Sequence, residues 1–272
     1  MPIICEGVGY KYPGATEYVL RDVNLEIGEG EAVAIMGDNG AGKTTLVKHF
    51  NGLLKPVEGT VYVDGVDTKE AEVSLLARKV ALVFQYPEKM FFSESVYKEV
   101  EFALRNFGFE ERLIHKIVEK TLKTFWLWEY RDRSPYTLSG GEQRRLALAS
   151  IVSWDPKYIV LDEPTAGQDA IQREILIHLI WRKVREGKTI VLVSHDVEFI
   201  AEFSPRVILM HRGRILYDGE GDELFRRRDL LEKAGLDQPI LYKVASSLGI
   251  GDGEVTLARL IDYIVGLRPC SD

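Results

Sequence analysis

The sequence lacks any long apolar run, and no stretch approaches the roughly eighteen consecutive apolar residues of a membrane-spanning helix. The first ten residues show neither a basic region nor a long apolar core, so we expect no secretory signal there. Cysteine is scarce: Cys5 and Cys270 stand at opposite ends of the chain and share no metal-ligand spacing. We therefore expect two unpaired thiols.

The chain also lacks an excess of basic residues. Its formal net charge is −7 at pH 7, which argues against a general nucleic-acid-binding surface. The short basic clusters at 144–145 and 226–228 fit solvated helix faces. What remains is a chain of 272 residues, 46% hydrophobic and 28% charged, which suits one large globular domain with or without small additions.

Short apolar runs recur along the chain and alternate with helical patterns. Several runs are continuously apolar, which is typical of strands buried on both faces of a parallel sheet. The runs cover residues 3–8, 32–37, 59–65, 80–85, 158–163, 189–195 and 206–219, and helical patterns cover 43–54, 171–187 and 196–203. This alternation predicts an α/β fold with a mixed sheet, which has a mainly parallel core and a partly antiparallel edge from the N-terminal strands.

Two helical segments stand outside this alternation. Residues 88–153 hold helical patterns at 95–108, 111–130 and 140–152 with no strand among them, which predicts an inserted helical subdomain in a larger domain spanning 1–221. The helical patterns in residues 222–272 predict a small C-terminal helical extension with a turn at 249–254. Its two apolar stripes are too short to form a core alone, so we expect them to pack on the main domain or on a partner. The stripes consist of Ile240, Leu241, Val244 and Leu248, and of Leu257, Leu260, Ile261 and Ile264.

The stretch GDNGAGKTT at 37–45 matches a phosphate-binding loop, and an expected strand precedes it while a helix follows it. Its glycines let backbone N–H groups surround a phosphate, Lys43 adds a positive charge near the β and γ oxygens, and the Thr44 hydroxyl can ligate Mg²⁺. The pattern predicts a site for ATP with Mg²⁺. We expect contacts from the whole loop: Gly37, Asp38, Asn39, Gly40, Ala41, Gly42, Lys43, Thr44 and Thr45.

Polar residues end three of the expected strands and supply the remaining chemistry. Asp162 ends the run YIVLD and can hold Mg²⁺ beside the phosphate loop, and Glu163 after it can polarise an attacking water. His195 closes the run TIVLVSH, where it can contact the γ-phosphate. Gln85 closes VALVFQ and can ligate Mg²⁺ or water.

A second anion site is predicted at LSGGE, residues 138–142, where a helix begins. The hydroxyl of Ser139 and the backbone N–H groups of Gly140 and Gly141 can hold a γ-phosphate. A serine-capped helix start with glycines for close packing is the alternative explanation of these residues. One phosphate loop needs only one nucleotide, so a second cradle on another subdomain indicates a nucleotide held by a partner chain.

The motifs GDNGAGKTT, Gln85, LSGGEQRR, YIVLDEPTAGQD and LVSH, in this order, resemble the nucleotide-binding subunit of an ATP-binding-cassette (ABC) transporter over roughly residues 2–220. The resemblance implies that Tyr12 stacks on adenine. It also implies a head-to-tail dimer with a second ABC ATPase, the same chain or a paralogue, with ATP between one chain's phosphate loop and the other's LSGGE. Two positions depart from the family pattern: Glu142 replaces the usual Gln, and Gln168 replaces the usual Leu before Asp169.

Within this family, the segment FQYPEKMFFSESVYKEVEFALRNFG at 84–108 is similar to the ATPases of energy-coupling-factor transporters, which take up vitamins and metal ions. That likeness implies a peripheral subunit on the cytoplasmic face of the cell membrane. It also implies a transmembrane coupling protein and a substrate-binding membrane subunit as partners, with no nucleic acid. Another ABC importer or exporter, or a soluble ABC ATPase of translation or DNA repair, are the alternatives. Translation members usually carry two cassettes and repair members a long coiled coil, and this sequence shows neither.

Overall fold

The computed structural model describes residues 1–86, 89–165, 170–203, 205–250 and 255–266, without the side chains of 170–172 and 259. The described strands form two sheets, with the orders β2-β1-β4-β5 and β10-β9-β3-β8-β7-β6. Their bounds are β1 (Ile3–Tyr10), β2 (Leu20–Ile27), β3 (Ala32–Met36), β4 (Glu58–Val63), β5 (Val66–Asp67), β6 (Val80–Val83), β7 (Tyr158–Asp162), β8 (Thr189–Ser194), β9 (Arg206–His211) and β10 (Arg214–Glu220).

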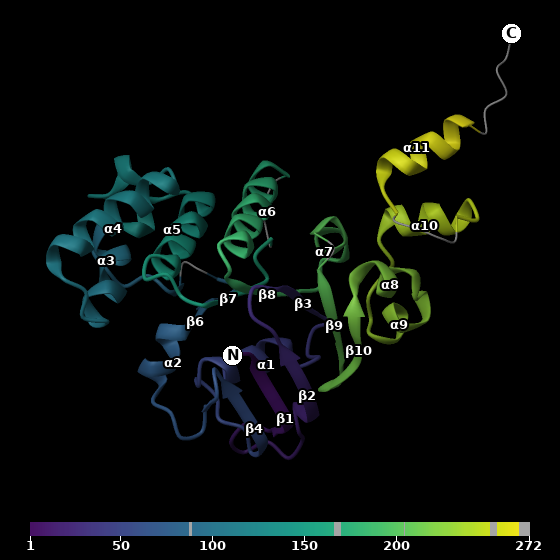
Figure 1. The fold of residues 1–272 in the computed structure, drawn as a ribbon, viewed down its shortest axis with the longest axis horizontal. Coiled ribbons are helices and arrows are strands. Elements are labelled where there is room, and N and C mark those ends of the chain that lie inside the picture. The colour runs from purple at the N-terminus through teal and green to yellow at the C-terminus, as the bar shows by residue number, and fades with distance from the viewer. Residues whose placement is uncertain (87–88, 166–169, 204, 251–254, 267–272) are drawn as a thin grey trace, which may run out of the picture.

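The described helices lie on both sides of the larger sheet. Their bounds are α1 (Lys43–Phe50), α2 (Val73–Lys79), α3 (Val96–Asn106), α4 (Glu111–Thr124), α5 (Gly140–Val152), α6 (Ala170–Arg185), α7 (Val197–Phe203), α8 (Gly221–Arg226), α9 (Arg228–Lys233), α10 (Ile240–Ser247) and α11 (Leu257–Gly266). In Figure 1, α5, α6 and α7 lie above the row of strands, whereas α1 lies below it with the smaller sheet. The helix expected over 111–130 ends earlier, at Thr124, and Trp126 beyond it has a left-handed φ of 55°.

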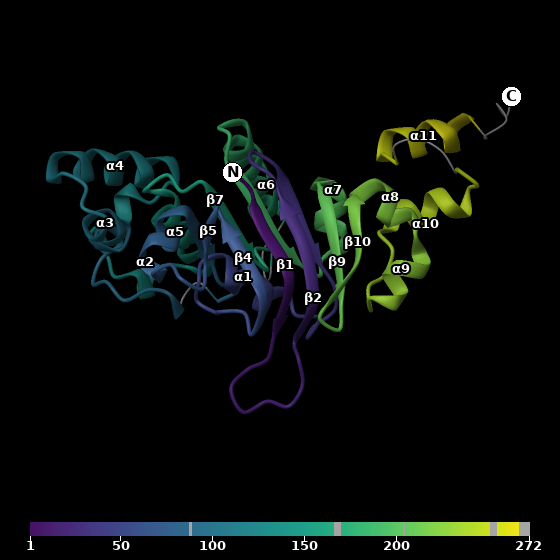
Figure 2. The same cartoon turned by 60° about the horizontal axis from the view of Figure 1, so that its bottom comes forward.

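The larger sheet is mixed, as the sequence predicts. Strands β9, β3, β8, β7 and β6 are parallel, and only β10 runs antiparallel, beside β9. The N-terminal strands differ from expectation, because they form a separate antiparallel sheet around β1 rather than an edge of the parallel one. Both edges of β3 are already paired, with β8 and β9. The long loop between β1 and β2 projects from the molecule in Figure 2.

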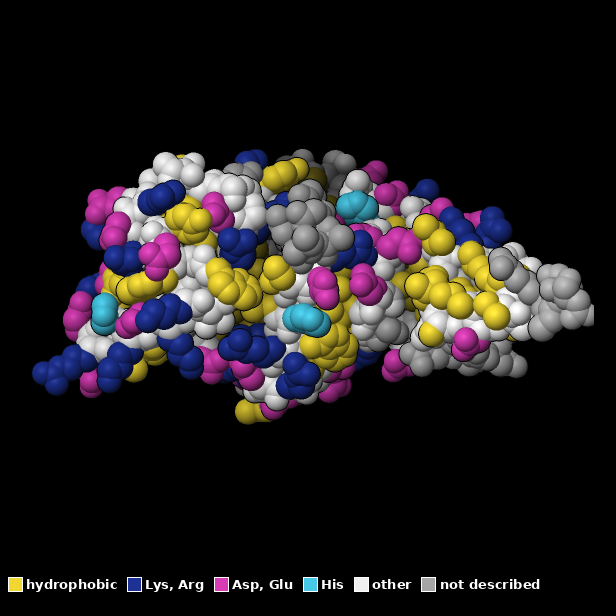
Figure 3. All heavy atoms as spheres, turned by 90° about the horizontal axis from the view of Figure 1, so that it is seen from above, with side chains coloured by type: hydrophobic (Ala, Val, Ile, Leu, Met, Phe, Trp, Pro, Cys, Tyr) yellow, Lys and Arg dark blue, Asp and Glu magenta, His cyan; other side chains and the backbone are white. Residues whose placement is uncertain are grey.

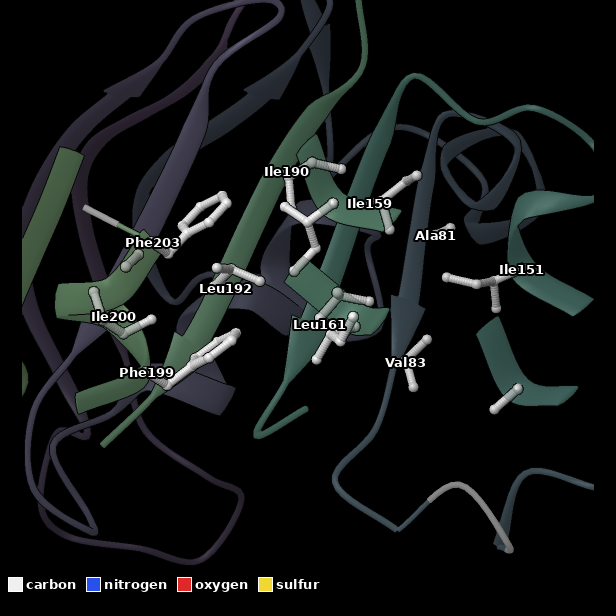
Figure 4. Packing of buried hydrophobic residues seen from close by; sticks show 14 of the residues in the cluster. Ala81, Val83, Ile151, Ile159, Leu161, Ile190, Leu192, Phe199, Ile200 and Phe203 are labelled. Atoms are coloured by element: carbon white, nitrogen blue, oxygen red, sulfur yellow. The ribbon is translucent and has the colours of Figure 1, made fainter. Parts of the chain in front are cut away.

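The parallel strands separate two hydrophobic cores, because successive side chains of a strand point to opposite faces. In β7, Ile159 and Leu161 join the core under α5, α6 and α7, whereas Tyr158 and Val160 join the core that contains α1 and the smaller sheet. Figure 4 shows the first core, where side chains from β6, β7 and β8 meet Phe199 and its neighbours on α7. Alternation continues at the next residue, so Asp162 faces the α1 side.

Along the chain, helices α3, α4 and α5 come between β6 and β7, and the structure gives no strand in residues 89–157. The C-terminal helices begin with α8, which packs on β9 and β10. Helices α10 and α11 lie at the far end of the molecule from α3 and α4 (Figures 1 and 2). The buried side of α10 carries Tyr242 and Ala245, whereas Ile240 of the expected stripe is 62% exposed. Part of the expected turn at 249–254, the Gln168–Asp169 position and Cys270 lie outside the described residues. Cys5 is buried.

Candidate nucleotide site

The loop from Gly37 to Gly42 connects β3 to the first turn of α1. Gly37 has a φ of 148°, and a Cβ placed on it would lie 2.3 Å from the carbonyl oxygen of Met210 at the end of β9. Gly42 precedes α1 with a φ of 101°. Only glycine satisfies these backbone conformations without strain, so the glycines of the predicted phosphate loop are required by its shape.

Lys43 begins α1 and points its ammonium group back into this loop. The side chain is buried, and Nζ donates hydrogen bonds to the carbonyl oxygens of Gly37 (2.7 Å) and Asp38 (3.0 Å). Burial lowers the pKa of Lys43, while the negative charges of Glu163 and Asp162 oppose that shift. A cation with only carbonyl partners inside a glycine-rich loop can exchange them for the oxygens of a bound phosphate.

Asp162 ends β7 and lies on the face of the sheet that α1 covers. Its Oδ2 accepts a hydrogen bond from the Thr44 hydroxyl at 2.8 Å, which joins two residues far apart in sequence. Its Oδ1 is buried and has no hydrogen-bond partner in the part of the chain that the structure describes, and burial raises the pKa of Asp162. Gln85 lines the same open cavity as Thr44 and Asp162, which has a volume of about 490 Å³. The structure thus brings the three predicted metal ligands together.

This set of groups fits a divalent cation such as Mg²⁺. A carboxylate oxygen, a hydroxyl and an amide oxygen are hard ligands, and Mg²⁺ bound with a nucleotide takes one or two carboxylates plus phosphate and water oxygens. The unpartnered Oδ1 of Asp162 is the buried acceptor that such an ion would satisfy. No group of three or more His, Cys, Asp or Glu side chains suited to a metal occurs among the described residues.

Glu163, the predicted base, and His195, the predicted γ-phosphate contact, touch one another directly. The His195 Nδ1–H donates to Glu163 Oε1 at 2.7 Å, and the Ser194 hydroxyl lies 3.5 Å from Glu163 Oε2. Glu163 is buried, whereas the His195 side chain is 51% exposed. The backbone of Glu163 has a left-handed φ of 49°, which is unusual for a non-glycine residue.

Tyr12 lies beside the phosphate loop. Its hydroxyl and that of Thr45 are hydrogen-bonded at 3.1 Å, and its ring packs edge-on against Tyr10 with centroids 5.1 Å apart. The ring is 39% exposed, so part of it is open to solvent next to the start of α1. This placement allows a flat aromatic ligand to stack near the loop.

The LSGGE segment lies at the start of α5, on a different element from the phosphate loop. The Ser139 hydroxyl accepts from the Glu142 N–H, and Glu142 Oε2 accepts from both the N–H and the hydroxyl of Ser139 at 2.8 Å. This is a capping box, in which the hydrogen bond from the Ser139 N–H lowers the pKa of Glu142. The structure therefore confirms the helix cap. Among the described residues, no hydrogen bond joins 139–142 to the phosphate loop.

Two contacts near Glu163 were not anticipated from the sequence. The Ser194 hydroxyl accepts from the Asp196 N–H at 3.0 Å and so ties the end of β8 to the Glu163–His195 pair. Arg144 on α5 donates to the carbonyl oxygen of Pro164 at 3.3 Å, which connects the LSGGE helix with the segment after β7. Ser194, which precedes His195 in LVSH, could have indicated the first contact. The second contact uses the backbone carbonyl of Pro164, and no sequence pattern marks a backbone acceptor.

Comparisons with known proteins agree with this geometry. The family model described as ABC transporter matches residues 20–166. A putative ABC transporter ATP-binding protein from Pyrococcus horikoshii is 44% identical over 85% of this chain and 88% of its own length. The energy-coupling factor transporter ATP-binding protein EcfA2 of Clostridium perfringens is 42% identical over 88% of this chain and 87% of its own.

Solved structures show the same architecture. The cbiO1 subunit from Clostridium perfringens, part of the ABC transporter complex cbiONQ, superposes with a TM-score of 0.76 at 32% identity and covers 90% of this chain and 98% of its own. The ATP-binding cassette MJ0796, a dimer with bound ADP and inorganic phosphate, gives a TM-score of 0.72 at 29% identity over 80% of this chain and 98% of its own.

Proposed function

This chain belongs to the ATP-hydrolysing subunits of ABC transporters, of the energy-coupling-factor type, and we propose that it drives solute uptake through membrane partners. One observation carries the ATP-hydrolysing role: the Thr44–Asp162 contact and the Glu163–His195 contact meet at the carboxyl ends of adjacent parallel strands. Ligands of open parallel sheets bind at those ends. ATP is therefore bound and cleaved there.

Each residue has a distinct role in this proposal. Loop N–H groups and Lys43 hold the β- and γ-phosphates, and the Glu163 carboxylate takes a proton from the attacking water. His195 donates to Glu163 from its Nδ1 and presents its exposed edge to the γ-phosphate. Thr44, Asp162 and Gln85 hold Mg²⁺, which supplies charge neutralisation for the phosphate oxygens when bound.

The LSGGE segment acts on the nucleotide of a second ABC ATPase chain. Its position on α5, apart from the phosphate loop of its own chain, supports this proposal. The N–H groups of Gly140 and Gly141 at the helix start can bind a γ-phosphate, and the Ser139 hydroxyl must turn from Glu142 to join them. Glu142 then keeps its hydrogen bond from the Ser139 N–H and continues to cap the helix.

The C-terminal helices pair with those of the second ATPase. Apolar side chains gather on the outer surface of the C-terminal helices (Figure 3), and most of the exposed ones belong to α11. A surface of this kind, continuous and exposed, favours a protein interface. Its exposed members are Ile240, Leu257, Ile261, Tyr263, Ile264 and Val265. We propose that this pairing holds the two ATPases together without nucleotide, while the 1–221 parts open and close.

No helix in the described ranges is long and apolar enough to cross a bilayer. We propose that the chain works peripherally, on the cytoplasmic face of the membrane, with a coupling protein docked on the helices of 88–153 and a separate substrate-binding subunit. Affinity purification of the tagged chain from detergent-solubilised membranes, followed by identification of the bound chains, tests this. The proposal expects a polytopic membrane protein with an ABC ATPase. Recovery of ribosomal or DNA-repair proteins instead would favour a soluble regulatory ATPase.

A further inference from the structure

The end of α9, in the C-terminal extension, touches the phosphate loop. The carbonyl oxygen of Ala234 accepts a hydrogen bond from the Asp38 N–H at 3.1 Å. Ala234 is fully buried, and the turn after it is closed by the Leu236 N–H, which donates to the carbonyl oxygen of Leu231 at 2.9 Å. The acceptor is therefore held firmly by the end of its own helix.

Gly235 brings this turn unusually close to Asp38. It has a left-handed φ of 74°, and a Cβ placed on it would lie 2.8 Å from Asp38 Oδ2 and 3.0 Å from Asp38 Cβ and Cγ. The other carboxylate oxygen, Oδ1, accepts from the Asn39 N–H at 2.6 Å, so the Asp38 side chain cannot turn away without losing that bond. A side chain at Gly235 would thus push on the loop itself.

The backbone of Asp38 is hydrogen-bonded on two sides, and both bonds matter for the nucleotide. Its N–H is fixed by Ala234 on one side, and its carbonyl oxygen accepts from Lys43 Nζ at 3.0 Å on the other. When phosphate oxygens replace the carbonyl oxygens of Gly37 and Asp38 as the partners of Lys43, the Ala234 hydrogen bond remains to hold the Gly37–Asp38 peptide plane, to which the Asp38 N–H belongs. The rest of the loop can then keep its N–H groups aimed at the phosphates.

We propose that the Ala234–Gly235 turn is a positioning element of the nucleotide site, which sets the phosphate loop through Asp38. The extension then serves nucleotide binding through its first part and pairing through α10 and α11. The same turn leads directly into α10, and the Gln238 side chain anchors that connection by donating to the carbonyl oxygen of Phe225 at 2.8 Å. This inference rests on the nucleotide site proposed above.

A matched pair of substitutions tests it. Gly235→Ala and Gly249→Ala both place a Cβ on a left-handed glycine after a tail helix, with φ of 74° and 71°, but a Cβ at Gly249 meets no atom of the described residues within 4 Å. Both pay similar backbone strain, and only Gly235→Ala displaces Asp38. We expect Gly235→Ala to raise the Kd for ADP and the KM for ATP about tenfold, with kcat changed little and the unfolding temperature lowered as in the control.

A double substitution separates positioning from general damage. Asp38→Gly removes all three atoms that the new Cβ would meet, so Gly235→Ala should change the ADP Kd less than about twofold in that background. If Gly235→Ala fails to fold, Gly235→Asn with Gly249→Asn repeats the comparison, because Asn adopts the left-handed conformation more readily. Equal effects at 235 and 249, or an undiminished effect in the Asp38→Gly background, would overturn the inference.

Lys43→Ala distinguishes this inference from the site on which it rests. If Lys43→Ala leaves the ADP Kd unchanged, the proposed nucleotide site itself is wrong. If Lys43→Ala loses ADP binding while Gly235→Ala behaves as Gly249→Ala does, the nucleotide site stands and the positioning role is rejected.

Discussion

Replacing Glu163 by Gln should remove hydrolysis and spare ATP binding. The amide has the shape of the carboxylate, and its carbonyl oxygen can still accept from His195 Nδ1, which now lies 2.7 Å away. The backbone at φ 49° is unchanged, so the fold should be unaffected. What disappears is the proton acceptor for the attacking water, which is worth about 10²–10⁴ in rate, or about 3–5 kcal/mol of transition-state stabilisation.

Binding should hold or tighten, because the substitution also removes a negative charge close to where the γ-phosphate lies. The assay compares steady-state release of phosphate with the Kd for ATP measured by titration calorimetry. Glu186→Gln, at an exposed position directly after the end of α6, is the matched control and should leave both quantities unchanged. A Glu163→Gln protein that turns over ATP at near the parent rate would refute the assignment of the base.

Three more outcomes follow. Lys43→Ala should raise the Kd for ATP about tenfold or more, since a charge that contacts bound phosphate in the ground state is lost, and an unchanged Kd would contradict this. Asp64 is partly buried, which alone would raise its pKa, but hydrogen bonds led by Lys157 lower it to about 2. Because the pKa of Asp64 in the folded protein lies below the ordinary value, its contribution to the free energy of unfolding is full above about pH 4 and is lost as the pH falls toward 2. Asp64→Asn should therefore lower the free energy of unfolding in urea by about 1 kcal/mol at pH 6 and by much less at pH 2.5. An equal loss at both pH values would refute this linkage. Ile261→Glu should weaken the nucleotide-free dimer about tenfold in sedimentation, whereas Leu113→Glu, similarly exposed on α4 (46% against 49%), should not, and equal effects would remove the tail from the interface.

The sequence was most informative where one motif occupies one strand end. The run before Asp162 gave both the buried strand and the direction of its carboxylate, so the contact with Thr44 could be anticipated across more than a hundred residues. Glu163 and His195 were likewise placed at strand ends from the sequence, but their hydrogen bond to one another was found only in the structure, where their strands are neighbours. The predicted loop glycines at 37 and 42 also have the backbone conformations that glycine alone adopts readily.

Other features were beyond such reasoning for physical reasons. The oxygens of Met210 and Ala234 that meet the phosphate loop belong to the backbone, which every residue type supplies, so no sequence pattern marks them. The N-terminal strands form a separate sheet because β8 and β9 already occupy both edges of β3. Which strand pairs with which edge is set by the tertiary fold and not by a local pattern in the sequence. Ile240 is exposed because α10 packs on α8 through Tyr242, which contacts Phe225. The other members of its stripe, Leu241, Val244 and Leu248, are half-buried against the core.

The central claim is that each ATP lies between the phosphate loop of one chain and the LSGGE segment of another. Mixing Ser139→Arg protein with Lys43→Ala protein tests it most directly. Each homodimer has two damaged sites, whereas a mixed dimer has one intact site and one site damaged twice. If the chain pairs with itself, mixing at random should restore about a quarter of the parent ATPase rate, given independent sites. No recovery, in a sample where mixed dimers are demonstrated by mass, would contradict the account.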